Sequence, residues 1–114
     1  MKLSSIFLFI SIFSLCFATG VSREISDTTA KLTIDTSATG IIVKEELSDG
    51  CQITSSNPDY DKKEGSLYKW AIYSDALKAG VIEYAFSCPS KFNSAGSWQT
   101  LEEEGEITTS KNTQ

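Results

Sequence analysis

The chain of 114 residues contains no histidine, only two prolines and only three cysteines. Without histidine, the protein has no Ser-His-Asp or Cys-His catalytic arrangement and no metal site with histidine ligands. Positive charge is also scarce, with 10 basic against 15 acidic side chains. Nucleic acids and anionic membranes attract basic surfaces, so we expect neither of them as a partner. The length suffices for one small domain.

Only one long hydrophobic run is present, and it lies at the N-terminus. It starts at Ile6 and ends at Phe17, after the charge of Lys2 and before small residues that end at Gly20. This pattern is typical of a secretory signal peptide, which we place at residues 1–18. A helix that spans a membrane needs about 20 apolar residues, and this run is shorter and interrupted by serines. The sequence therefore predicts a secreted, extracellular protein without stable membrane association.

The cysteines indicate one disulfide. Cys16 is removed with the signal peptide, which leaves Cys51 and Cys88 as an even pair in an oxidising compartment. Neither has a Cys-x-x-Cys partner or a neighbouring base that would make it a reactive thiol. Their strands, interpreted independently, place Cys51 on the face of Ile53 and Cys88 on the face of Phe86. The two sulfurs are therefore expected to point into the same interior.

The rest of the chain alternates apolar and polar residues with a period of two, which favours strands. We expect an all-β fold, a small antiparallel β-sandwich or barrel of about six short strands, with one short helical turn near 74–80. The expected strands are 30–35, 41–45, 51–54, 67–73, 81–88 and 98–101. They form a β domain over 30–107. A loose N-terminal arm is expected at 19–29, and a disordered tail at 108–114, because both segments are polar.

No arrangement of residues predicts an enzyme, a cofactor or a metal site. The acidic loop at 59–65 does not have the oxygen ligands and glycine of a calcium-binding loop. Aromatic residues are more informative, because they are frequent in binding surfaces as well as in cores. Among them, Tyr60, Tyr73 and Trp98 are the candidates for exposed contacts with a partner protein. The sequence therefore favours a non-enzymatic protein-binding module, expected to be a monomer.

The signal peptide, the short chain, the strand pattern from Leu32 to Leu101 and the single pair Cys51 and Cys88 together resemble small secreted effectors of plant-pathogenic fungi. The resemblance is to the MAX type, a compact β-sandwich whose disulfide bridges its two sheets. It implies a virulence effector that binds a host protein, with delivery into host cells, and it implies no catalytic residue. Two alternatives remain open: a secreted toxin or inhibitor of an extracellular enzyme, and a small carboxylate-dependent hydrolase.

Overall fold

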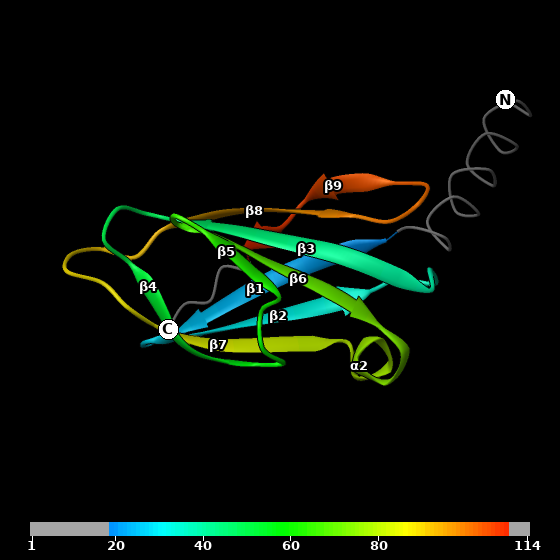
Figure 1. Ribbon diagram of the computed structural model, residues 1–114, viewed down its shortest axis with the longest axis horizontal. Coiled ribbons are helices and arrows are strands. Elements are labelled where there is room, and N and C mark those ends of the chain that lie inside the picture. The colour runs from blue at the N-terminus through cyan, green and yellow to red at the C-terminus, as the bar shows by residue number, and fades with distance from the viewer. Residues whose placement is uncertain (1–18, 110–114) are drawn as a thin grey trace, which may run out of the picture.

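The computed structural model describes residues 19–109 and contains two five-stranded sheets (Figure 1). The predicted signal peptide and residues 110–114 of the predicted tail lie outside the described residues. Sheet A has the strand order β10 (Thr108–Thr109), β1 (Gly20–Ser26), β2 (Thr29–Asp35), β7 (Val81–Ser87) and β4 (Gln52–Asn57). Sheet B has the order β5 (Lys62–Glu64), β6 (Leu67–Tyr73), β3 (Gly40–Leu47), β8 (Ser94–Gln99) and β9 (Glu104–Glu106).

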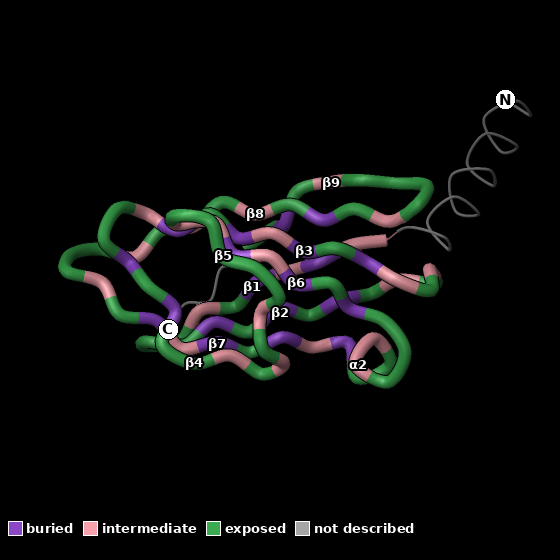
Figure 2. The backbone as a smooth tube through the Cα atoms, in the orientation of Figure 1, coloured by how far each residue is buried: buried purple, intermediate pink, exposed green. Residues whose placement is uncertain are grey.

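The core lies between the two sheets. Buried and exposed residues alternate along the strands, as the bands in Figure 2 show. On β6, Tyr68, Trp70 and Ile72 are buried, and on β7 the buried residues are Ile82, Tyr84 and Phe86. The all-β sandwich and both of these buried faces are confirmed. All strand pairs are antiparallel except β1 with β10.

The expected loose arm at 19–29 is wrong. Most of this segment forms β1, which pairs with β2 from Gly20↔Asp35 to Ser26↔Thr29. Val21 and Arg23 face the core and are buried. The segment looks polar in the sequence because Arg23 occupies an inward position. A buried arginine is stable only when another element supplies a partner for its charge. Likewise, Thr108 and Thr109 of the predicted tail form β10 beside β1.

The number and limits of the later strands also differ from the expectation. The described residues form ten strands, because β1, β5, β9 and β10 add to the six expected. The strand expected at 98–101 lies at Ser94–Gln99. Its first half consists of small residues without an apolar alternation, so the sequence pattern there is weak. The expected helical turn is confirmed as α2 (Ser74–Ala79), which ends at Gly80 in the left-handed region with φ 67°.

The predicted disulfide between Cys51 and Cys88 is confirmed, with an S–S distance of 2.04 Å. Cys51 directly precedes β4 and Cys88 directly follows β7, and the next residues in register are Gln52 and Ser87. The bond therefore joins two neighbouring strands of sheet A. The resemblance implies a disulfide between the two sheets, and this disulfide does not bridge them.

Hydrogen bonds reinforce the same end of the sandwich. The backbone N–H of Ser48 donates to the carbonyl oxygen of Asn93 at 2.9 Å, and the N–H of Asn93 donates to the hydroxyl oxygen of Ser48 at 3.1 Å. These contacts attach the β3–β4 turn to the segment between β7 and β8, far from α2 at the other end (Figure 1). The disulfide and the Ser48 contacts thus hold one end of the molecule closed.

Candidate functional site

The three aromatic residues expected to contact a partner have different environments. Tyr73, at the end of β6, is 63% exposed. Tyr60 is half-buried at the border of the core, with its ring centroid 4.9 Å from that of Tyr68. Trp98 is buried, so its expected exposure is wrong: it lies opposite Val43 on the inner side of sheet B. Tyr73 alone of the three therefore presents its ring to solvent.

Tyr73 belongs to an apolar group on the outer face of sheet B. Ile42, which is 38% exposed, pairs with Ala71, and Tyr73 pairs with Gly40. Residues two apart on a strand point to the same side, so Ile42, Ala71 and Tyr73 share the outer face. We call these three residues the Tyr73 patch. Because Gly40 has no side chain, nothing on the neighbouring strand covers the tyrosine ring from that side.

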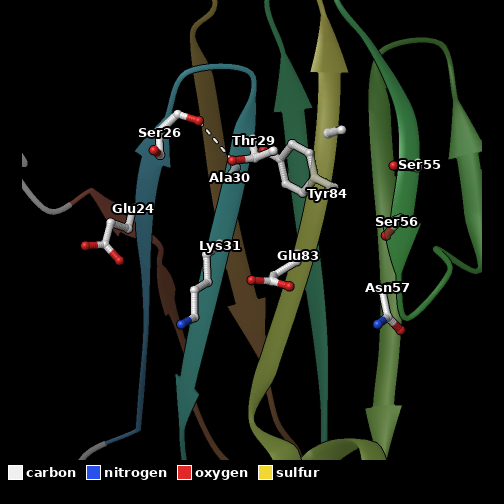
Figure 3. Close-up of a pocket in the computed structure, with 11 residues that line it drawn as sticks. Glu24, Ser26, Thr29, Ala30, Lys31, Ser55, Ser56, Asn57, Glu83 and Tyr84 are labelled. Carbon is white, nitrogen blue, oxygen red and sulfur yellow. Dashed lines mark hydrogen bonds between the residues drawn. The ribbon is translucent and has the colours of Figure 1, made fainter.

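A second feature is an open groove of about 600 Å³ on the outer face of sheet A (Figure 3). A polar row crosses its floor, with Glu24, Lys31, Glu83 and Asn57 in direct register on four adjacent strands. The hydroxyl groups of Ser26, Thr29 and Ser55 line the neighbouring part of the groove. The groove therefore offers hydrogen-bond donors and acceptors but no exposed aromatic ring.

The hydrolase alternative would need two carboxylates on either side of a scissile bond. Glu24 and Glu83 are the only glutamates that line this groove, and both are exposed to solvent. Lys31 stands between them in register and in Figure 3. An exposed lysine therefore separates the two carboxylates. The geometry of the groove therefore does not favour carboxylate catalysis.

The sequence interpretation missed a buried charged cluster between the sheets. Glu45 of β3 is fully buried and Arg23 of β1 is 2% exposed. The Nε of Arg23 donates to Oε2 of Glu45 at 2.8 Å, Nη2 donates to Oε1, and the Tyr84 hydroxyl donates to Oε2 at 2.7 Å. Arg23 Nη1 donates to Oγ1 of Thr109 at 2.7 Å. We call Arg23, Glu45 and Tyr84 the Arg23 cluster. It links sheet A to sheet B, and the bond from Arg23 to Thr109 also holds β10 against β1.

A signal for this cluster was present in the alternation of β3. Glu45 is two residues from both Val43 and Leu47, which are buried, so the alternation places its carboxylate inward. Gly96 on β8 provides the room for it: a Cβ at this position would lie 2.6 Å from Ile107 Cδ1 and closer still to Glu45 Oε1. The role of the cluster is structural, because its polar groups bond to one another and to Thr109 between the strands.

Two protonation effects follow from the same contacts. Burial, together with the negative charge of Glu45 and the hydrogen bond to it, raises the pKa of Tyr84 far above its usual value. Burial lowers the pKa of Arg23, but the hydrogen bond to Glu45 and the negative charge of Glu45 outweigh this and raise it. The cluster is therefore held with Tyr84 neutral and Arg23 positively charged.

We expect the protein to lose stability as the pH rises above about 10, where the tyrosine of the unfolded chain ionises. The unfolded state then binds fewer protons than the folded state, so the free energy of unfolding falls with pH. Urea unfolding between about pH 8 and pH 11 measures this slope. Tyr84→Phe should have a smaller slope, whereas Tyr73→Phe, which retains Tyr84, should behave as the wild type. Equal slopes in all three proteins would contradict the assignment.

Comparison with known proteins finds no family model that matches the chain and no significant match among curated proteins or solved structures. Among residues 19–109, no helix is long and apolar enough to cross a membrane. Within the same residues, no group of three or more acidic or cysteine side chains is arranged to hold a metal ion. The surfaces of this chain itself are therefore the basis for inferring its function.

Proposed function

We propose that this protein is a secreted protein-binding module whose contact surface is the outer face of sheet B around the Tyr73 patch. The single observation that carries the proposal is the 63% exposure of Tyr73 beside the exposed Ile42. Tyrosine is enriched among residues that contribute most to protein–protein binding, because it buries a large rigid area and retains a hydroxyl group for hydrogen bonding. An exposed apolar group beside charged side chains on a sheet face is typical of such sites.

Secretion is part of the proposal and has separate support. The disulfide between Cys51 and Cys88 fits an oxidising compartment, and the N-terminal sequence has the pattern of a signal peptide. In the form that the resemblance to fungal effectors implies, the partner is a host protein. The open polar groove on sheet A lacks an aromatic anchor, so it is the weaker of the two candidate surfaces.

Site-specific photo-crosslinking tests the proposal. A benzophenone side chain at Ala71, which is exposed within the Tyr73 patch, should crosslink to a partner among secreted and cell-surface proteins of the producing organism and its hosts. Once that partner is purified, Tyr73→Ala should weaken its binding by about 30-fold, the effect of removing an anchor of about 2 kcal/mol. Calorimetry with the purified partner gives the dissociation constant.

Leu101→Ala is the matched control, because Leu101 is apolar and 98% exposed but lies outside the Tyr73 patch. It should bind the partner as the wild type does. The proposal is wrong if Tyr73→Ala and Ile42→Ser both bind the crosslinked partner with wild-type affinity. Circular dichroism and a urea midpoint for each variant exclude an indirect effect through unfolding.

A further inference from the structure

Three lysines form an unbroken row on the outer face of sheet B. Lys62 of β5 pairs directly with Lys69 of β6, and Lys69 pairs directly with Lys44 of β3. Neighbouring strands are about 4.8 Å apart, so the three side chains project in parallel from adjacent backbones. We call Lys44, Lys62 and Lys69 the lysine row. It concentrates positive charge in a chain with a net charge of −5.

The lysine row does not stabilise the fold. Like charges directly opposite one another on a sheet repel, and each such pair costs stability. In the described part of the chain, Lys62 forms one ion pair, with Glu64 at 3.4 Å, and both side chains are more than half exposed. Lys44 and Lys69 form none among residues 19–109. The positive charges of these two lysines are therefore available to a partner.

The lysine row lies directly beside the Tyr73 patch. Lys44 follows Ile42 by two residues on β3, and Lys69 precedes Ala71 by two residues on β6. Two residues along a strand correspond to about 7 Å, the distance between side chains on one face of an extended chain. A partner segment can therefore place an acidic side chain on the lysines and a neighbouring apolar side chain against Ile42 and Tyr73.

We infer that the outer face of sheet B binds an acidic segment of a partner protein, with its carboxylates on the lysine row and an apolar side chain on the Tyr73 patch. This inference rests on the proposed function and names the chemistry of the partner. Carboxylates limit the basic area in two directions. Glu46 and Glu64 lie two residues beyond Lys44 and Lys62 on the same strands, on the side away from the Tyr73 patch. Across the sheet, Ser97 follows Lys44 and Glu106 follows Ser97. A broad anionic surface, such as a membrane, would meet these carboxylates, whereas a narrow segment avoids them.

A peptide titration tests the inference. The probe is a fluorescein-labelled synthetic peptide of glutamate and phenylalanine, and its companion has lysine in place of glutamate. The wild-type protein should bind the acidic peptide and not the basic one, with affinity that falls as salt is added. The triple variant Lys44→Gln, Lys62→Gln, Lys69→Gln should bind the acidic peptide about tenfold more weakly, as expected for the loss of three exposed ion pairs.

The matched control is the triple variant Lys31→Gln, Lys78→Gln, Lys91→Gln, which changes the net charge equally but removes exposed lysines outside sheet B. Its affinity should stay within about twofold of the wild type. Equal weakening in the two triple variants, or no binding of the acidic peptide, overturns the inference. The inference is also wrong if the protein binds phosphatidylserine vesicles or heparin more tightly than the peptide and the lysine-row variant loses that binding. The partner would then be a membrane or a polyanion.

The outcome also separates this inference from the proposed function. If the lysine-row variant binds the crosslinked protein partner with wild-type affinity while Tyr73→Ala binds it weakly, the acidic chemistry is wrong and the Tyr73 patch remains the contact surface. If Tyr73→Ala and Ile42→Ser both bind that partner normally, the proposed function itself is wrong.

Discussion

Glu45→Gln should lower the free energy of unfolding by about 3–5 kcal/mol, the usual cost of leaving a buried ion without its partner. Glutamine has nearly the same size as glutamate, so the packing around Val43 and Gly96 is retained. The change removes the negative charge that compensates Arg23, which is 2% exposed. A loss of this size is a large share of the stability of a small domain. Urea unfolding followed by tryptophan fluorescence measures it through the midpoint.

Two further variants test the cause of this loss. Glu46→Gln changes the adjacent exposed carboxylate and should shift the free energy of unfolding by less than about 1 kcal/mol. The double variant Arg23→Met, Glu45→Leu removes both charges and should recover most of the stability lost in Glu45→Gln, because apolar residues of similar size can replace a buried ion pair. If the double variant is less stable than Glu45→Gln, the uncompensated charge is not the source of the effect.

Removal of the disulfide should have a comparable effect. The bond joins residues 37 positions apart. In the chain-entropy model, the double variant Cys51→Ala, Cys88→Ala should lose about 4 kcal/mol, because the unfolded chain gains the freedom that the crosslink denied it. The dependence of the free energy on urea concentration should also steepen, because an unfolded chain without the crosslink exposes more surface. Both quantities come from one urea titration.

Reduction provides the control for this variant. Dithiothreitol should shift the wild-type midpoint to that of Cys51→Ala, Cys88→Ala and should leave the variant unchanged. The folded wild-type protein should contain no free thiol at Cys51 or Cys88 when it is assayed without reductant. A wild-type midpoint that is insensitive to reduction would show that the crosslink contributes little to stability.

Much of the core follows from local sequence. The alternation on β6 predicts that Tyr68, Trp70 and Ile72 are buried, and β7 is predicted in the same way. Such predictions succeed because successive side chains of a strand point to opposite faces, so one apolar face identifies the interior. The same rule predicts the disulfide, because it places both cysteines on inward faces.

The segments that were predicted wrongly depend on residues far along the chain. Arg23 makes β1 look like a polar arm, because its partner Glu45 is 22 positions away and on the other sheet. Trp98 looks like a candidate for exposure because the first half of β8 has no apolar alternation, yet its pairing with Val43 turns it inward. The alternation of β3 indicates that Glu45 points inward, but no local pattern identifies its partner or that of Trp98.

The candidate binding surface also depends partly on local sequence and partly on the pairing of distant strands. The sequence alone places Tyr73 on the face of β6 opposite to Trp70, and it supplies the lysines. Only the pairing of β3, β5 and β6 brings Lys44, Lys62 and Lys69 into one row beside the Tyr73 patch.

The all-β class, the inward faces of the main strands and the Cys51–Cys88 bond follow from the sequence, because they depend on a period of two and on an even pair of cysteines. Which strands are neighbours does not follow from it. Strand order and register arise from long-range packing, and they set the partners of each charge. For this reason one arginine is held in the core by Glu45, whereas three lysines are left side by side on the surface.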